Sequence, residues 1–296
     1  MCQVGLLPPG DDDVVVDMEW SGISTGTEKL LWSGRMPHFP GMGYPLVPGY
    51  EWVGRVAAAG PTAVIQIGER VFVPGAQCYE DVRGLFGGAA ARVVVPSSRV
   101  FAISESMGEQ AILLALAATA QHALAAKDST SPDLVVGHGV LGRLIARIAA
   151  MSGQAPTVWE LDPQRRRGAE GYCVVDPDSD PRRDYRMIVD VSGDPAILDK
   201  LVARLAPGGE IVLAGFYSEP LSFAFPPAFM REARIRVAAE WRPDDMVAVR
   251  SHVEAGRLSL DGLITHRENV ERAESAYRSA FSDPACLKMV LDWRPS

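Results

Sequence analysis

The chain has 296 residues, is 47% hydrophobic, and carries 29 basic against 37 acidic side chains, for a net charge of −8. This length predicts about two domains, and an acidic chain without a basic run is not expected to bind nucleic acid. The four scattered cysteines form no C-x-x-C pair, which argues against a disulfide framework or a zinc knuckle and favours a reducing cytoplasm.

No segment has the pattern of a membrane span or a signal sequence. The longest apolar run, 111–120, is shorter than a bilayer requires, and Pro8 and Pro9 interrupt the stretch that follows Met1. We therefore expect a soluble, cytoplasmic protein. This expectation leaves contact with a membrane surface open.

Short β-type runs separated by glycine and proline fill the first 110 residues. We predict strands near 14–20, 51–57, 70–73 and 91–95. Many short strands with turns between them are typical of a barrel or a sandwich. The segment 32–50 is too rich in proline and glycine for a helix or a central strand.

From Glu109 the pattern changes to alternating helices and strands. An alanine- and leucine-rich stretch, 111–126, has helical spacing. Further strands are predicted at 134–137, 157–160, 174–175, 187–191, 210–215 and 235–239, and further helices at 141–151, near 195–206 and at 243–255. This alternation predicts an α/β fold with a parallel, doubly wound sheet. After Gly256 we expect a linker, a helix around 268–281 and a last strand at 287–291.

One motif in the second region points to a nucleotide ligand. Gly137-His138-Gly139-Val140-Leu141-Gly142 follows a predicted strand with the spacing G-x-G-x-x-G, and Glu160 ends the next strand 18 residues beyond Gly142. Strand, glycine turn, helix, strand and acid in this order form the dinucleotide-binding fingerprint. The glycines permit a tight turn and close approach of the pyrophosphate, whose charge the helix N-terminus stabilises. We therefore assign to a cofactor site Gly137, Gly139, Val140, Leu141, Gly142 and Glu160, with His138 as a neutral spacer.

The acid at position 160 narrows the choice of cofactor. A carboxylate there accepts hydrogen bonds from ribose hydroxyls and repels a 2′-phosphate, which favours NAD over NADP. The run Arg165-Arg166-Arg167 is the competing feature, since arginines could reach a phosphate. Thr119 is a candidate for the nicotinamide side, unless its hydroxyl only bonds its own helix. The ends of two further strands should border the nicotinamide half, namely Val191, Ser192, Gly193, Gly215 and Phe216.

Motifs over most of the chain resemble those of the medium-chain dehydrogenase/reductase superfamily. The stretch 21–28 stands where that family has a G-I-C-G-x-D loop, and 48–54 stands where it has P-G-H-E-x-x-G. Further matches lie at 115–124, 263–267 and 288–291. The resemblance implies a GroES-like, mostly β catalytic domain of residues 1–112 plus 257–296, short on its N-terminal side. It also implies a Rossmann dinucleotide-binding domain of residues 113–256.

Besides the short N-terminal side, several departures from this family pattern concern zinc. Ser24 or Thr25 replaces the ligand cysteine of the first loop, Tyr50 replaces the ligand histidine, and Ala115 occupies the second cysteine position. A catalytic zinc needs three donors that are normally thiolate, imidazole or carboxylate. The region of the structural zinc lobe, 74–88, holds only Cys78. We therefore predict that no metal is bound.

Longer segments resemble one branch of the superfamily, the bacteriochlorophyllide a dehydrogenases of phototrophic bacteria. This resemblance implies NAD-dependent oxidation of the 3-(1-hydroxyethyl) group of a tetrapyrrole, a bacteriochlorophyllide, to 3-acetyl in bacteriochlorophyll biosynthesis. The superfamily further implies a homodimer formed through an edge of the nucleotide-binding sheet. The segments that carry the resemblance are 21–28, 39–50, 136–139, 215–217, 240–241 and 259–266.

Alcohol oxidation without zinc still needs a proton acceptor. Tyr50 is the leading candidate because it replaces a ligand that faces the cleft, and a neighbour that lowers its pKa would let it exchange a proton. Glu51, Glu28 and Thr27 could form its relay. The alternatives are that Tyr50 only fills the space left by the metal, that Glu51 is structural, or that His38 is the base.

A flat, apolar pigment needs a wide apolar slot. One wall is predicted from Trp32, Phe39, Met42 and Tyr44, and a second wall includes Phe225. Aromatic residues and methionines also occur in cores and dimer interfaces, which is the alternative interpretation. Exposed apolar surface around such a slot could make peripheral contact with a membrane.

Two other functions are compatible with the same motifs. A zinc-free enone or quinone reductase of the superfamily delivers hydride to an activated alkene, although such enzymes usually take NADPH and Glu160 argues against that cofactor. A cofactor-binding protein that has lost its catalytic site is the non-enzymatic alternative. Reduction of NAD on addition of the pigment alcohol separates these hypotheses.

Overall fold

The strand β1 (Asp13–Ile23) organises the first part of the chain. Its side chains alternate between buried and half-buried positions, as expected for a strand with one face on a core. β3 (Trp52–Ala59) pairs with it in antiparallel fashion along its length. On the other side, the first half of β1 pairs with β6 (Arg92–Pro96) and the second half with β15 (Met289–Asp292). The C-terminal end of the chain thus completes a sheet that the N-terminal end began.

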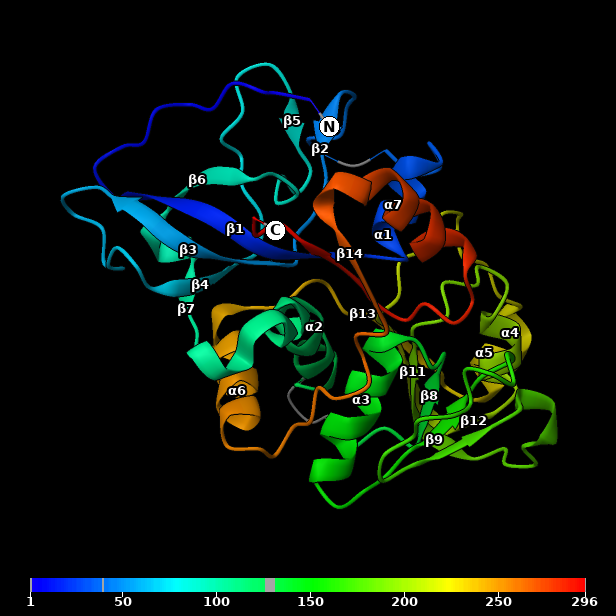
Figure 1. Ribbon diagram of the computed structural model, residues 1–296. Coiled ribbons are helices and arrows are strands. Elements are labelled where there is room, and N and C mark those ends of the chain that lie inside the picture. Colours follow the sequence, from blue (N-terminus) through cyan, green and yellow to red (C-terminus); the bar gives the residue numbers. More distant parts are fainter. Residues whose placement is uncertain (1, 39, 126–130, 296) are drawn as a thin grey trace. The chain divides into compact units, whose positions relative to one another are not determined.

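The computed structural model describes residues 2–38, 40–125 and 131–295 and divides into two compact units (Figure 1). The first unit comprises 1–115 with 263–296, and the second comprises 116–262. The main sheet of the first unit has the order β14-β15-β1-β3-β4-β7, with β6 beside β1, and a small second sheet pairs β2 with β5. The remaining strands of this unit are β2 (Leu46–Val47), β4 (Arg70–Val73), β5 (Arg83–Gly84), β7 (Phe101–Ala102) and β14 (His266–Asn269).

Two short helices cover one end of the first unit. α1 (Thr27–Trp32) follows β1 directly, and α7 (Ala273–Ser282) joins β14 to β15. Ala276 and Ala280 of α7 pack with Ile23 and Met289 in one buried cluster. The end of β1 therefore lies in the same packed cluster as the C-terminal segment. The 3₁₀ helices of the unit are η1 (Ser97–Arg99), η2 (Glu105–Leu113) and η4 (Val270–Arg272).

The second unit is built on a parallel six-stranded sheet of order β10-β9-β8-β11-β12-β13. This confirms the predicted doubly wound α/β fold. In Figure 1, α2, α3 and α6 lie on one side of the sheet, and α4 and α5 lie on the other. The strands are β8 (Leu134–Val136), β9 (Thr157–Trp159), β10 (Cys173–Val175), β11 (Tyr185–Asp190), β12 (Leu205–Leu213) and β13 (Arg234–Val237). The helices are α2 (Leu114–Leu124), α3 (Val140–Met151), η3 (Pro177–Ser179), α4 (Leu198–Val202), α5 (Phe225–Met230) and α6 (Pro243–Glu254).

Three local predictions were wrong. The helix expected near 195–206 is only the five residues of α4, and β12 begins at Leu205 rather than Glu210. Pro207-Gly208-Gly209 therefore lies inside the strand, where the register against β11 shifts and Gly208 takes a φ of +70°. In addition, the predicted linker contains β14, which pairs in parallel with β15.

Among the described residues, none of the helices combines the length and the apolar character that crossing a membrane requires.

Candidate functional site

The glycine turn of the second unit has the geometry of an anion-binding site. Gly137 follows β8 with a φ of +101°, and Gly139 is the N-cap of the twelve-residue helix α3. A Cβ atom at position 142 would lie 1.9 Å from the carbonyl oxygen of Gly137, so only glycine permits this contact. A Cβ atom at position 139 would meet no atom within 4 Å, so that side of the turn is open. The open side faces the start of α3, where unpaired N–H groups and the helix dipole stabilise a phosphate.

The predicted nicotinamide-side residues lie beside this turn. A Cβ at Gly137 would lie 3.3 Å from the backbone nitrogen of Ser192, and one at Gly215 would lie 3.2 Å from the Cα of Val191. Gly193 has a φ of +71°, and a Cβ on it would lie 3.2 Å from the carbonyl oxygen of Phe216. The structure therefore brings these residues together where β8, β11 and β12 end. The half-buried Thr119 lies in α2.

Glu160 directly follows β9, and its carboxylate is held by backbone N–H groups. Oε2 accepts from the N–H of His138 at 3.1 Å, and Oε1 accepts from the N–H of Asp162 at 2.9 Å. The carboxylate is therefore fixed against the glycine turn, at the position that the fingerprint assigns to the ribose contact. The competing Arg166 donates to the carbonyl oxygens of Glu160 and Leu161 and pairs with Asp176.

His138, predicted as a neutral spacer whose backbone matters, also makes two contacts through its side chain. Its side chain is fully buried, with Nδ1 at 2.6 Å from the carbonyl oxygen of Arg165 and Nε2 at 2.8 Å from the hydroxyl of Tyr172. A carbonyl only accepts, so Nδ1 donates and Nε2 accepts from Tyr172. Burial lowers the pKa of His138 to about 4, which agrees with this neutral tautomer. Neither contact could be predicted from the motif, because Arg165 and Tyr172 lie 27 and 34 positions further along the chain.

The first unit holds a separate polar cluster around Tyr50. The Tyr50 hydroxyl lies 2.8 Å from Oγ of Ser24 and also bonds Thr27, the first residue of α1. Burial, together with the nearby carboxylates of Glu51 and Glu28, raises the pKa of Tyr50. No neighbour lowers its pKa far enough for easy ionisation, so the phenol stays protonated near neutral pH. Tyr50 is therefore suited to hold or pass a proton as a neutral hydroxyl.

Glu28 is the group in this cluster whose pKa lies nearest neutrality. It is buried on α1, where Oε1 accepts from the N–H of Ser24 at 3.0 Å and Oε2 accepts from the hydroxyl of Tyr277 at 2.8 Å. Burial raises its pKa to about 7, and the charge of Glu51 adds to this effect. Lys288 and the two hydrogen bonds act in the opposite direction. A carboxyl group with such a pKa can exchange a proton under physiological conditions.

Glu51 and Lys288 form a buried ion pair beside Glu28. The ammonium of Lys288 lies 2.5 Å from Oε2 of Glu51, and the side chains are 2% and 0% exposed. A Cβ at Gly22 would lie 2.6 Å from the same oxygen, so the glycine on β1 makes room for the carboxylate. Oε1 of Glu51 has no hydrogen-bond partner among the described residues. Sequence reasoning missed Lys288 and Tyr277, because both come from the C-terminal segment more than 220 positions away.

The residues predicted to form the substrate walls are divided between the units. Trp32, Met42 and Tyr44 lie in the first unit, and Phe225 lies in the second. Trp32, 52% exposed, stacks on Tyr277 with ring centroids 5.8 Å apart. The exposed Tyr44 donates to the carbonyl oxygen of Leu31, while Met42 packs against a buried cluster of Leu31, Met36 and Leu85. Phe225 lies in the second unit beside Phe229, at a centroid distance of 5.7 Å. Phe39 lies outside the described residues, and His38 is exposed.

The positions that hold zinc in the resembled family carry no suitable donors. Ser24 and Tyr50 hydrogen-bond each other through their hydroxyls, and Ala115 is buried in α2. Within the ranges that the structure describes, no group of three or more His, Cys, Asp or Glu residues is arranged to hold a metal ion. The hydroxyl donors and the alanine do not fit a catalytic zinc.

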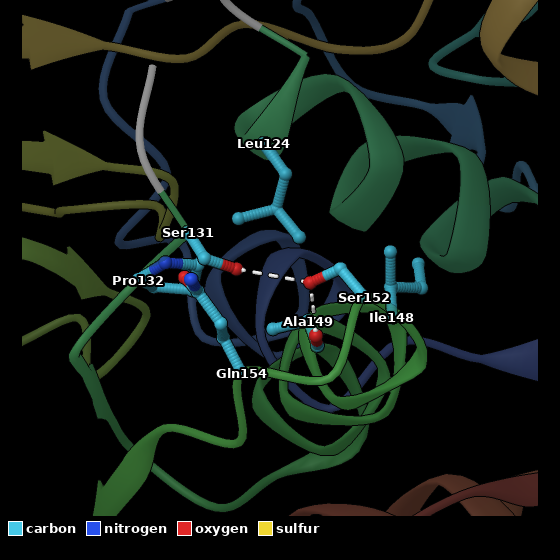
Figure 2. Close-up of a pocket in the computed structure, with 7 residues that line it drawn as sticks. All are labelled: Leu124, Ser131, Pro132, Ile148, Ala149, Ser152 and Gln154. Carbon is cyan, nitrogen blue, oxygen red and sulfur yellow. Dashed lines mark hydrogen bonds between the residues drawn. The ribbon is translucent and has the colours of Figure 1, made fainter.

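A cavity of about 380 Å³ in the second unit lies away from the glycine turn (Figure 2). Ser152, which caps the C-terminal end of α3, lines it, and its Oγ is 3.2 Å from Oγ of Ser131. The glycine turn is at the opposite end of α3, about 18 Å away at 1.5 Å per residue. The lining consists of Leu124, Ser131, Pro132, Ile148, Ala149, Ser152 and Gln154, so it includes none of the predicted site residues.

Comparison with known proteins places this geometry in a family. Residues 10–105 match the Alcohol dehydrogenase GroES-like domain. The chain is 59% identical over 292 residues to the 2-desacetyl-2-hydroxyethyl bacteriochlorophyllide A dehydrogenase of Rhodobacter capsulatus, covering 98% of this chain and 93% of the relative. The protein of the same name from Cereibacter sphaeroides is 57% identical with the same coverage. The acetophenone reductase of Geotrichum candidum, solved in complex with NAD, shares the fold at 18% identity, with a TM-score of 0.83 over 97% of this chain and 92% of that chain. The chain therefore belongs to the medium-chain dehydrogenase/reductase family of oxidoreductases.

Proposed function

We propose that this protein oxidises the hydroxyethyl side chain of a bacteriochlorophyllide to an acetyl group, in bacteriochlorophyll biosynthesis, with NAD as the hydride acceptor. The observation that carries the proposal is the identity of 59% and 57% to two 2-desacetyl-2-hydroxyethyl bacteriochlorophyllide A dehydrogenases, over 98% of this chain. The glycine turn and the buried polar cluster around Tyr50 supply a dinucleotide site and a proton-exchanging site. The substrate is thus a tetrapyrrole with a secondary alcohol.

The reaction removes a hydride from the carbinol carbon and a proton from its oxygen. When bound, the oxidised nicotinamide accepts the hydride. The chain's own residues must then take the proton. We propose that the alcohol donates a hydrogen bond to the neutral Tyr50, which passes its own proton to the hydroxyl of Ser24 or Thr27 as it takes up that of the alcohol. From these hydroxyls the proton moves to Glu28, whose carboxyl group lies against the backbone N–H of Ser24. The pKa of about 7 at Glu28 suits this role, because an acceptor works best near the pH at which the enzyme operates.

We also propose that this chemistry proceeds without zinc. Hydroxyl groups and an alanine stand where a zinc enzyme has thiolates and an imidazole. A carbinol on a conjugated macrocycle develops positive charge that the π-system shares, which lowers the need for a Lewis acid. A comparison of turnover of the pigment alcohol with that of an unconjugated secondary alcohol tests this point. Equal rates would contradict it.

The choice of NAD rests on Glu160. Its carboxylate is fixed by two N–H groups and would repel a 2′-phosphate. Arg166, one of the three arginines able to counter that repulsion, is engaged with carbonyl oxygens and with Asp176. We expect purified enzyme with hydroxyethyl-bacteriochlorophyllide to reduce NAD, measured by absorbance of the reduced nicotinamide, at least ten times faster than NADP. Binding of NAD without turnover would instead support the non-catalytic alternative.

A matched pair of tyrosine variants tests the proton path. Tyr50→Phe should lower the rate of hydride transfer roughly 10²–10⁴-fold, the usual contribution of acid–base groups. Tyr79→Phe is the control, because the Tyr79 hydroxyl donates to the carbonyl oxygen of Gly87 in the same unit and Tyr79 is not one of the predicted site residues. An unchanged rate in Tyr50→Phe, measured in single turnover, removes Tyr50 from the mechanism.

We also propose that the chain forms a homodimer through its second unit. β13 is the end strand of the six-stranded sheet, so its outer backbone groups face away from β12. Exposed apolar side chains accompany it in and around α5: Phe225, Phe229, Met230, Ile235 and Val237. These features support the homodimer that the family resemblance implies, and peripheral membrane contact is the alternative use of the same surface. Light scattering of the purified chain, with Val237→Lys as the disrupting variant, distinguishes a dimer from a monomer.

A further inference from the structure

Arg143 is a buried cation directly beneath the glycine turn. It stands in the first turn of α3, is 4% exposed, and donates to four backbone carbonyl oxygens. The distances are 3.1 Å to His138, 3.0 Å to Arg165, 2.7 Å to Arg167 and 2.9 Å to Gly168. A Cβ at position 168 would lie 2.7 Å from the guanidinium, so the glycine there lets the backbone come this close. Arg143 thereby connects the turn to the segment that follows Glu160.

His138 holds the same segment from a second direction. The carbonyl oxygen of Arg165 accepts from both His138 and Arg143, and Tyr172 donates to the other imidazole nitrogen. The backbone N–H of His138 donates to Glu160. The segment 161–172, which we name the adenosine loop, is thus tied to the glycine turn at both of its ends and in its middle. Motif spacing specifies none of these ties.

The hydrogen bonds from His138 and Arg143 determine which side chains surround the position expected for the adenosine ribose. Glu160 is held with both oxygens on N–H groups, and the backbone of the arginine run is fixed at Arg165 and Arg167. Arg166 is directed to Asp176 and to carbonyl oxygens. A bound 2′-phosphate would need at least one arginine to turn toward it and the carboxylate to move away. Both changes require the adenosine loop to shift.

We propose that His138 and Arg143 are positioning residues that set cofactor specificity, by holding the adenosine loop so that it presents the Glu160 carboxylate and does not close its arginines around a 2′-phosphate. This inference rests on the proposed use of NAD and extends it to two residues outside the fingerprint. Loosening the loop removes a preformed NAD site and at the same time frees the arginine run. The two cofactors should therefore respond differently to the same substitution.

The affinities of the full chain for NADH and NADPH test the positioning role of His138 and Arg143, and their measurement needs no turnover of substrate. Dissociation constants of NADH and NADPH are measured by fluorescence titration for the unaltered chain, His138→Ala and Arg143→Met. We expect NADH to bind about tenfold more weakly to either variant, as the loss of hydrogen bonds to charged or buried groups implies. NADPH should bind equally well or more tightly, so that the preference for NADH falls at least tenfold. An unchanged preference, with both cofactors weakened alike, would overturn the proposal.

Two further variants separate positioning from general loss of stability. Arg204→Met is the matched control, because Arg204 is also buried and donates to the carbonyl oxygens of Pro177, Asp180 and Arg182. It precedes β12, and its guanidinium packs on the ring of Trp159 at 5.0 Å; none of these contacts involves the glycine turn or Glu160, so its loss should leave the cofactor preference unchanged. Tyr172→Phe removes the donor to His138 and should give a smaller change in the same direction, about two- to fivefold.

The outcomes distinguish this proposal from the proposed reaction. Equal binding of NADH and NADPH to the unaltered chain would overturn the NAD assignment and the positioning role with it. Selective NADH binding that Arg204→Met abolishes as fully as Arg143→Met would overturn the positioning role alone. Selective binding that responds to His138 and Arg143 supports the proposal even where the pigment alcohol is not turned over.

Discussion

Lys288 in the first unit and Arg143 in the second are both buried cations, and they are stabilised in different ways. The ammonium of Lys288 forms an ion pair with Glu51, next to a second carboxyl group at Glu28. Arg143 donates to four carbonyl oxygens, and none of the described carboxylates forms an ion pair with it. An ion pair depends on the charge of both members, whereas carbonyl groups do not titrate. The first arrangement therefore controls charge beneath Tyr50, and the second controls the shape of a loop.

Removal of Lys288 should produce the largest effect on stability. Lys288→Met leaves the buried Glu51 carboxylate without its counter-charge, and one of its oxygens already has no partner among the described residues. Breaking such a pair from one side typically costs about 3–5 kcal/mol. Urea unfolding of Lys288→Met and of Lys288→Met/Glu51→Gln measures this. The double variant should recover much of the loss, because it no longer buries a lone charge. Equal loss in both would show that the charge of Glu51 is not the cause.

Acidification should lower the free energy of unfolding of the second unit, because it protonates the buried His138. Its folded-state pKa of about 4 is below the ordinary value of 6.5, so its contribution to stability is complete above pH 6.5 and is lost as the pH falls through 4. At about 1.4 kcal/mol per unit of pKa, the contribution reaches roughly 3 kcal/mol at most. Unfolding free energy followed from pH 7 to 4 should fall less steeply in His138→Gln than in the unaltered chain. Parallel curves would contradict the buried, neutral assignment.

Loss of Arg143 should cost less than loss of Lys288. Arg143→Met removes a donor from four carbonyl oxygens, but that of Arg165 still accepts from His138, and Arg167 and Gly168 lie on the surface, where water can replace the lost donor. We expect a loss of about 1–3 kcal/mol in urea unfolding. Arg143→Lys, which keeps the charge but has fewer donors, should recover only part of it. Full recovery by lysine would mean that charge, rather than the set of carbonyl contacts, is what matters at this position.

Sequence reasoning worked best where one continuous segment makes the feature. The glycine turn, the helix after it and Glu160 depend on backbone geometry and on a spacing that the chain itself displays. The parallel sheet followed from the alternation of helices and strands. β12 was predicted poorly because glycine and proline inside a strand resemble a turn, and β14 was missed because His-Arg-Glu-Asn lacks apolar alternation.

The cluster around Tyr50 shows why the rest was out of reach. Its members come from β1, α1, the start of β3, α7 and the approach to β15, and only the folded sheet brings them together. The sequence pointed to Tyr50, Glu51, Thr27 and Glu28 through a family motif but gave no sign of Lys288 or Tyr277. The direction of the Tyr50 pKa shift was likewise unpredictable, because it depends on burial and on the carboxylates that the fold places nearby.

The smallest expected effect comes from Tyr277, which donates to Glu28 across the cluster. Tyr277→Phe removes a hydrogen bond that favours the ionised carboxylate, so the pKa of Glu28 should rise above its value of about 7. The contribution of Glu28 to stability is complete below its ordinary pKa of 4.5 and is lost as the pH rises through the folded-state value. In Tyr277→Phe this loss should extend to higher pH. At pH 8, the free energy of unfolding measured in urea should be about 1 kcal/mol lower than that of the unaltered chain.

The control for this prediction removes the titrating group. In Glu28→Gln, the loss of stability between pH 4.5 and 8 should flatten, and adding Tyr277→Phe should no longer change its pH dependence. If Glu28 accepts the substrate proton, the acid limb of the kcat/KM profile should move to higher pH in Tyr277→Phe, since that limb reports the pKa of the free base. Lys288, Glu51 and Tyr50 also face this carboxyl group, but Tyr277→Phe leaves all three in place. A stability change without any shift of the pH profile would therefore confine Tyr277 to packing, and would remove Glu28 from the proton path.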